Sequence, residues 1–118
     1  MKLNHLNLTV SNVPETHRFL EKHFDLRSYG AQEPRDAMSF LSDDNGMVLA
    51  LFRAARGAAV NYPPCFHIGF IQESEERVNE INQRLQADGY DVAKPSRLHG
   101  SWTFYFKAPG GFTIEVLH

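Results

Sequence analysis

The sequence LNHLNLTV at residues 3–10 decides the fold, because it returns in altered form as CFHIGFI at residues 65–71. Both stretches alternate in the manner of a half-buried strand, and both carry a histidine, His5 or His67, at the same place. Overlaying these histidines also aligns NVPETHRFLEKHF with SEERVNEINQRLQ and, at nearly the same offset, NGMVLAL with GGFTIEV. The chain is therefore interpreted as two copies of one β-α-β-β-β unit.

The repeat predicts an α+β domain built from two modules, about residues 1–54 and 64–118, linked by residues 55–63. A module of this length is too small to bury a core alone, so the two are expected to pair. One helix is expected from a cap at Asn12 to about Phe24, and a second from a cap at Ser74 to Gly89. Further strands are expected near residues 26–33, 37–42, 47–52, 90–94, 101–107 and 111–117.

Composition limits the partners that the chain can have. At 118 residues, with 42% hydrophobic and 22% charged residues, the sequence is typical of one soluble globular domain. The net charge of -2 and the scattered basic residues argue against a nucleic acid partner. The single cysteine, Cys65, excludes an intrachain disulfide and fits a reducing compartment. No leader or membrane-spanning stretch is recognised, so a cytoplasmic protein with no membrane partner is expected.

Alternation along the strands predicts which polar side chains share a face. His5, His67, Tyr105 and Glu115 are all expected to line one concavity, since each lies opposite the apolar face of its strand. Two imidazoles and one carboxylate are the ligand set of a facial metal triad. A single strand histidine is more often a structural residue, but matching positions in a repeated frame favour ligands. The histidines off this pattern are predicted to be surface residues: His17, His23 and His118.

The paired modules and three short motifs resemble a known family. The motifs are the N-H-L opening, the F-H-I-G-F strand and the closing run F-Y-F-x-x-P-x-G-x-x-x-E. They resemble the vicinal oxygen chelate superfamily, which includes glyoxalase I, extradiol ring-cleaving dioxygenases, fosfomycin-resistance enzymes and bleomycin-binding proteins. Over the whole chain, the resemblance implies an open, cup-shaped β-barrel with its helices outside. It also implies homodimers, with metal sites sometimes shared between subunits.

The resemblance further implies one divalent metal ion, either iron, manganese, nickel or zinc, held by His5, His67 and Glu115. Glyoxalase-like members take a fourth ligand from the place that Ala50 occupies here, so a three-ligand site is expected. Three protein ligands leave positions open for substrate, as in the extradiol dioxygenases. Tyr105 matches a tyrosine that such enzymes place beside the substrate.

The predicted function is that of a metal-dependent enzyme whose small substrate chelates the metal through adjacent oxygens, closest to the extradiol dioxygenase-like branch. Tyr105 would donate a hydrogen bond to the oxygen that gains charge, and His99 would shuttle a proton. Three alternatives stay open: a metal-free drug- or metabolite-binding protein of the bleomycin-resistance kind, a glyoxalase-like lyase or isomerase, and a fosfomycin-type transferase. The residues expected to contact a substrate with an oxygenated end and an apolar body are Asn7, Phe40, Ala50, Phe52, Trp102 and Thr103.

Overall fold

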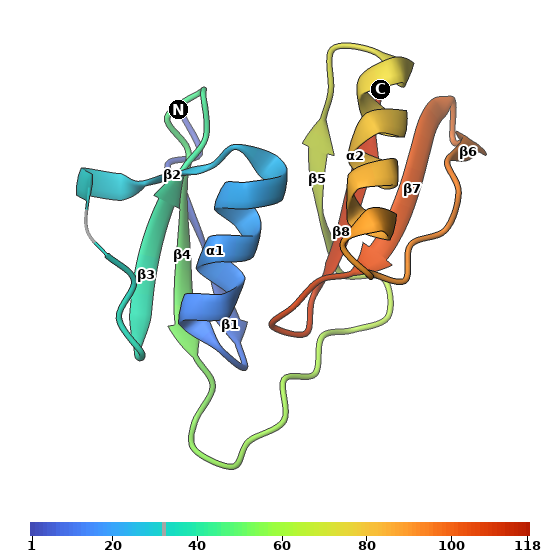
Figure 1. Cartoon of the computed structure of the whole chain (residues 1–118). Helices are drawn as coiled ribbons and strands as arrows, with labels where there is room; N and C mark the ends of the chain where they lie inside the picture. Colours follow the sequence, from blue (N-terminus) through green and yellow to red (C-terminus); the bar gives the residue numbers. More distant parts are fainter. Residues whose placement is uncertain (32) are drawn as a thin grey trace. The chain divides into compact units, whose positions relative to one another are not determined.

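Each repeat of the sequence folds into one sheet with one helix, as the computed structural model shows for residues 1–31 and 33–118 (Figure 1). The first repeat gives β1 (His5–Val10), α1 (Val13–Phe24), β2 (Arg27–Ser28), the 3-10 turn η1 (Tyr29–Ala31), β3 (Met38–Ser42) and β4 (Val48–Arg53). The second gives β5 (His67–Ile71), α2 (Glu75–Ala87), β6 (Ser96–Leu98), β7 (Ser101–Lys107) and β8 (Thr113–Leu117). The predicted α+β fold with two β-α-β-β-β modules is confirmed.

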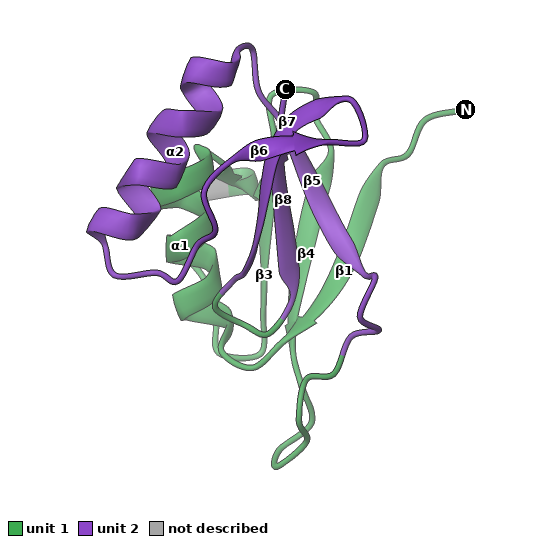
Figure 2. Cartoon of the chain, turned by 90° about the vertical axis from the view of Figure 1, so that its right-hand side faces the viewer, with its two compact units in different colours: residues 1–61, 109–111 green, residues 62–108, 112–118 purple. Residues whose placement is uncertain are grey.

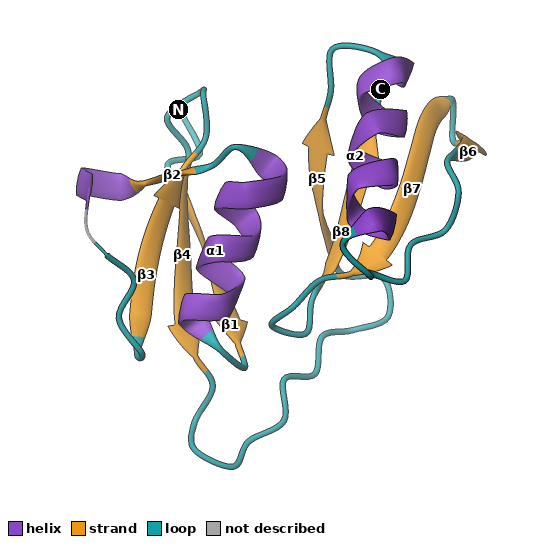
Figure 3. Ribbon diagram, in the orientation of Figure 1, coloured by secondary structure: helices purple, strands orange, loops and turns teal. Residues whose placement is uncertain are grey.

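The two sheets have the same strand order, β1-β4-β3-β2 and β5-β8-β7-β6 (Figure 3). In each sheet the first strand of the repeat runs parallel to the last, and the other neighbours are antiparallel. The pairing is also equivalent residue by residue. Ala50 lies between Asn7 and Phe40, and Glu115 lies between Gly69 and Tyr105. Equivalent positions in the two sheets therefore carry different side chains.

Local sequence sets both helices as expected. The Asn12 side chain accepts the backbone N–H of Glu15 to begin α1, and the Ser74 hydroxyl accepts that of Arg77 to begin α2. Each helix then buries an apolar stripe against one face of its own sheet. The buried core residues include Leu8, Val13, Leu20, Leu41 and Leu51 in the first repeat and Val78, Ile81, Leu85, Phe104, Ile114 and Val116 in the second.

Two predicted strands are wrong in extent. The strand expected at 26–33 is limited to Arg27–Ser28, because the chain then enters η1, where Gly30 has a φ of 70°. Residue 32 lies outside the described residues. The strand expected at 90–94 is a loop whose Ala93 carbonyl accepts the side-chain amide of Asn82. Pairing resumes only after Pro95, which has no N–H to offer a ladder, as β6.

The prediction that His17 and His23 lie at the surface is also wrong, whereas His118 is exposed. The two α1 histidines are only 0% and 2% exposed. His17 follows Val13 by four positions and precedes Leu20 by three, which is the spacing of the buried stripe. Their burial therefore had a signal in the helical period.

The described residues form two compact units that do not coincide with the two repeats (Figure 2). Unit 1 holds residues 1–61 and 109–111, and unit 2 holds residues 62–108 and 112–118. The tripeptide Pro109–Gly111, from the turn between β7 and β8, is fixed in unit 1. The Gly110 carbonyl accepts the N–H of Ser11 at 3.2 Å, and the Pro109 carbonyl lies 3.4 Å from Thr16 Oγ1, which donates to the Asn12 carbonyl at 2.7 Å. No helix in this described part of the chain is long and apolar enough to cross a membrane.

Candidate metal site

The Glu115 carboxylate is held in one orientation by its neighbours on β7. Its Oε1 accepts the Tyr105 hydroxyl at 2.5 Å. The Thr103 Oγ1 lies 3.1 Å from the same oxygen and 2.9 Å from the Val116 carbonyl, so its one proton is available to either acceptor. Because Oε1 is used in this way, Oε2 is the oxygen that remains to bind another group.

His67 presents its own lone pair to that second oxygen. Its Nδ1 lies 3.0 Å from the Cys65 carbonyl, which can only accept, so Nδ1 carries a proton. In a neutral imidazole Nε2 then bears the lone pair, and it lies 3.4 Å from Glu115 Oε2. Two acceptors this close are stabilised by a cation between them, either a proton or a metal ion. A backbone carbonyl that orients a histidine through its other nitrogen is typical of metal sites.

The space beside this pair is kept open by Gly69, which pairs with Glu115 in the sheet. A Cβ at this position would lie 3.7 Å from Glu115 Oε2 and 3.5 Å from Leu117 Cδ2. Any longer side chain on this face would therefore cover the carboxylate. The Tyr105 ring stands edge-on to His67, with 5.4 Å between ring centroids, and closes the other side. The donor set and the open space fit a divalent cation.

Tyr105 is expected to titrate at unusually high pH in the metal-free protein. Its hydrogen bond to Glu115, its burial and the carboxylate charge together raise the pKa of Tyr105 to about 12 from an ordinary 10.0. The unfolded chain loses this proton near pH 10 and the folded chain near pH 12. The stability that the group contributes is therefore complete below pH 10 and is lost as the pH rises toward 12.

Ultraviolet titration of metal-free protein, with Tyr105→Phe to assign the signal, would measure this pKa. Urea unfolding at pH 9 and pH 11 would measure the linked stability, which is expected to fall more in the native protein than in Tyr105→Phe. An equal fall in both proteins would contradict the predicted coupling to Glu115.

His5 lies in unit 1 with a comparable arrangement. Its Nδ1 is 3.0 Å from the side-chain oxygen of Asn4, which leaves Nε2 as the ligating nitrogen of a neutral ring. Among the residues that the structure describes, no three His, Cys, Asp or Glu side chains form a group that could hold a metal ion. His67 and Glu115 are thus a pair within unit 2, and His5 is a single donor of unit 1.

A pocket of about 480 Å³ opens beside His5. Phe40 and Phe52 lie on the same sheet face and meet edge to face, with ring centroids 6.2 Å apart. Asn7 shares that face by register. The described residues that line the pocket are Asn4, His5, Tyr29, Gly30, Phe40, Val48 and Ala50.

Three other predicted site residues, Thr103, Trp102 and His99, lie in different surroundings. Thr103 contacts Glu115, as described above. Trp102 lies on the opposite, helix-facing side of its sheet, where its indole N–H donates to Asn79 of α2 at 2.9 Å. This placement separates Trp102 from the face that carries Glu115. His99 lies in the exposed turn between β6 and β7, with a φ of 50°.

Sequence reasoning missed Tyr29 and Asn4 as pocket residues. Tyr29 was hidden by the strand expected at 26–33, since only the turn at η1 directs this segment to the pocket. Asn4 precedes β1, so strand alternation gave no signal for it. Val48 shares parity with Ala50, and that spacing was the available signal for it.

Comparisons with known proteins agree with the fold. The Glyoxalase/Bleomycin resistance protein/Dioxygenase superfamily model matches residues 2–116, and no curated protein matches the chain. A possible glyoxalase from Bacillus cereus is 47% identical, with 100% of this chain and 99% of that chain covered and a TM-score of 0.88.

Two more distant structures share the fold. A lactoylglutathione lyase from Agrobacterium tumefaciens is 18% identical, with 98% and 92% covered and a TM-score of 0.76. A mutant of the fosfomycin resistance protein FosX from Listeria monocytogenes, in complex with Mn(II) and a dihydroxypropylphosphonic acid, is 21% identical, with 98% and 90% covered and a TM-score of 0.77. The family model spans nearly the whole sequence, and on that ground the chain belongs to the glyoxalase/bleomycin resistance protein/dioxygenase superfamily.

Proposed function

We propose that residues 1–118 act as one domain and form a divalent-metal-dependent enzyme whose small substrate chelates the metal through adjacent oxygens. The observation that carries the proposal is the convergence of His67 Nε2 and Glu115 Oε2, 3.4 Å apart, each with its other polar atom already bonded. A histidine and a carboxylate fixed in this way are prepared ligands. A protein that only sequesters an apolar compound has no use for two such acceptors turned toward one another.

We propose His5 as the third ligand, from the same chain or from the partner chain of a homodimer. The strand register supports this proposal, because His5 and His67 occupy equivalent positions in their two sheets. Ala50, the counterpart of Glu115, has no donor atom, so a fourth ligand is not expected there. When bound, the metal would act as a Lewis acid on the substrate oxygens. Iron, manganese, nickel and zinc all accept two histidines and a carboxylate as ligands.

The chain's own residues would give the substrate its orientation. Tyr105 donates its one hydroxyl proton to Glu115 Oε1 and so orients the carboxylate. It would donate to a substrate oxygen that gains charge only once that hydrogen bond is broken. The pocket beside His5 would take the body of the substrate, with Phe40 as its aromatic wall. No Asp, Glu, Lys or Arg is among the described lining residues, so the pocket favours an uncharged body. This supports the dioxygenase-like branch over chemistry on phosphonates or glutathione conjugates.

Elemental analysis of protein purified without chelator tests the proposal, with His67→Gln as the variant and His118→Gln as its control. The two histidines are matched, because each is exposed and each has its Nδ1 3.0 Å from a backbone carbonyl. We expect one divalent ion per chain in the native protein and in His118→Gln, and a loss of affinity of more than about tenfold in His67→Gln.

The opposite result would be equally informative. A native protein that takes up no divalent ion, even when manganese, iron, nickel or zinc is added, would overturn the enzyme proposal. A metal-free binding protein would then be the better interpretation, and the apolar pocket would be its site.

A further inference from the structure

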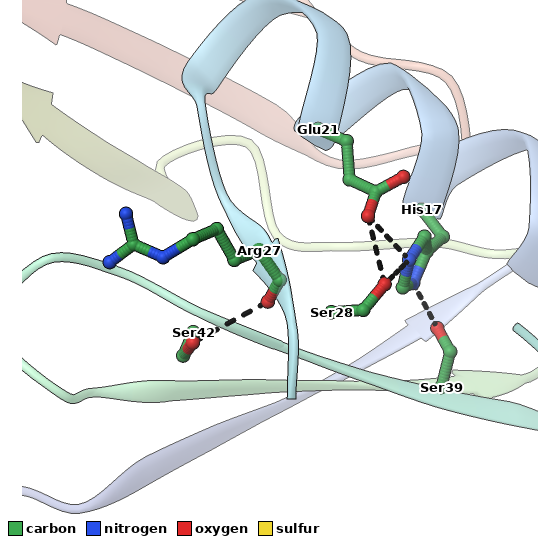
Figure 4. A network of polar contacts seen from close by, with 6 residues as sticks. All are labelled: His17, Glu21, Arg27, Ser28, Ser39 and Ser42. Carbon is green, nitrogen blue, oxygen red and sulfur yellow. Dashed lines mark hydrogen bonds and ion pairs between the residues drawn. The ribbon is translucent and has the colours of Figure 1, made fainter. Parts of the chain in front are cut away.

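The buried side chain of His17 links two strands of unit 1 (Figure 4). Its Nε2 lies 2.8 Å from the Ser28 hydroxyl of β2, and its Nδ1 lies 3.1 Å from the Ser39 hydroxyl of β3. Ser28 donates its own proton to Glu21 Oε1 at 2.8 Å, so it must accept from His17 Nε2–H. Nδ1 then accepts from Ser39, and both ring nitrogens have partners in the neutral form.

β2 has few other attachments. It is two residues long and lies at the edge of its sheet. It pairs only with β3, through Arg27 with Ser42 and Ser28 with Leu41. A ladder this short is marginal by itself. The hydrogen bonds of the Ser28 hydroxyl to His17 and Glu21 are therefore a substantial part of what fixes the place of Ser28.

Both serines stand immediately before residues of the pocket wall. Tyr29 follows Ser28, and Phe40 follows Ser39. Both of these aromatic residues line the 480 Å³ pocket beside His5. The strand β3 is central and held on both sides by its neighbours, but the segment that begins at Tyr29 depends on β2. We call the part of the pocket lining formed by Tyr29 the Tyr29 wall. Its position is thus set by contacts on the side of the sheet that α1 covers, opposite the pocket.

We propose that His17 is a positioning residue, which holds the Tyr29 wall of the pocket through its hydrogen bond to Ser28. The assignment of this pocket to substrate rests on the proposed function, but the tether between His17 and Ser28 does not. Ser28→Ala removes the hydroxyl that bonds to both His17 and Glu21, while His17 Nε2 keeps Glu21 Oε1 as a partner at 3.3 Å, so no buried donor is abandoned. Glu21→Ala removes the Glu21 acceptor alone and should leave hydrogen exchange at residues 28–31 unchanged, which assigns the effect of Ser28→Ala to His17. Ser28→Thr keeps the hydroxyl and should restore the tether.

Ser42→Ala is the matched control. The Ser42 hydroxyl also reaches β2, at the Arg27 carbonyl 3.4 Å away, but has no link to His17. Hydrogen exchange should rise about fivefold at the amides of residues 28–31 in Ser28→Ala, which is the factor that one ordinary hydrogen bond is worth. In the same variant, exchange in β5, β7 and β8 should not change. In Ser28→Thr and Ser42→Ala, exchange at residues 28–31 should stay at the native rate. Unchanged exchange at residues 28–31 in Ser28→Ala, or an equal rise in unit 2, would overturn the proposal.

A second measurement tests whether the hydrogen bond between His17 and Ser28 affects ligand binding in the pocket. With manganese-loaded protein, the affinity for 4-nitrocatechol should fall about fivefold in Ser28→Ala and recover in Ser28→Thr, while manganese stoichiometry stays the same. Local loosening with unaltered affinity would overturn the positioning role. If the native protein binds neither manganese nor 4-nitrocatechol, the proposed function has failed, and the exchange measurement still decides whether His17 holds this wall.

Discussion

Glu115→Gln is expected to lower the affinity for a divalent ion by more than about a hundredfold, beyond the loss typical of residues that only orient a ligand. Glutamine has the same shape and can still accept the Tyr105 hydroxyl. It removes the negative charge, however, and its amide would point an N–H donor at His67 Nε2, which now faces a carboxylate oxygen at 3.4 Å. A hydrogen bond would then close the space that a metal ion would occupy.

Thermal unfolding with and without manganese measures this loss. A ligand present at about a hundred times its Kd stabilises the folded state by about 2.7 kcal/mol, and the variant should show almost none of this gain. Glu73→Gln, an exposed residue of the same unit, makes the same change in charge and should keep it. A manganese-dependent stabilisation that persists unaltered in Glu115→Gln would mean that Glu115 is not a ligand.

Gly110→Ala is expected to lower the free energy of unfolding by about 2 to 6 kcal/mol. Gly110 has a φ of 99°, where any other residue is strained by about 1 to 3 kcal/mol. An added Cβ would also lie 2.6 Å from Thr16 Oγ1 and 3.1 Å from Val10 Cβ, and overpacking of this kind costs about 1 to 3 kcal/mol more. Since a domain is stable by about 5 to 15 kcal/mol in total, the loss would be severe.

Gly57→Ala separates these two causes. Gly57 has a φ of 77°, but a Cβ there would meet nothing within 4 Å, so only the backbone strain applies. Urea denaturation of both variants should give the larger drop in midpoint for Gly110→Ala at an unchanged m value. Equal drops would show that Thr16 and Val10 move aside at no cost.

The sequence predicted the fold and the sheet faces because both depend on local periodicity. Overlaying Gly46 on Gly111 makes Phe40 the counterpart of Tyr105, and the strand register agrees, since Phe40 pairs with Ala50 and Tyr105 pairs with Glu115. That result needed only the period of two residues in a strand and the repeat itself. It is also why the histidine and carboxylate of unit 2 could be expected on one face.

Other features depended on contacts that no local pattern reports. The helical period indicates that His17 is buried, but its hydrogen-bond partners Ser28 and Ser39 lie 11 and 22 positions away in the chain and could not be predicted. The loop at 90–94 is fixed by the Asn82 amide from the middle of a helix. Trp102 was predicted to contact substrate because it is aromatic. Alternation along the strand, however, puts it on the same face as Phe104 and Phe106, and there its indole contacts Asn79 of α2.

The placement of Pro109–Gly111 in unit 1 also determines how the protein can be divided. The polypeptide crosses between units at residues 61–62, 108–109 and 111–112, so neither sequence repeat is a complete folding unit. A fragment that stops at Asn61 would leave the Ser11 amide without the Gly110 carbonyl. The tripeptide that completes unit 1 thus comes from a part of the chain that is synthesised long after the rest of that unit. Removal of the second repeat should therefore destabilise the first, even though the first sheet and its helix are left whole.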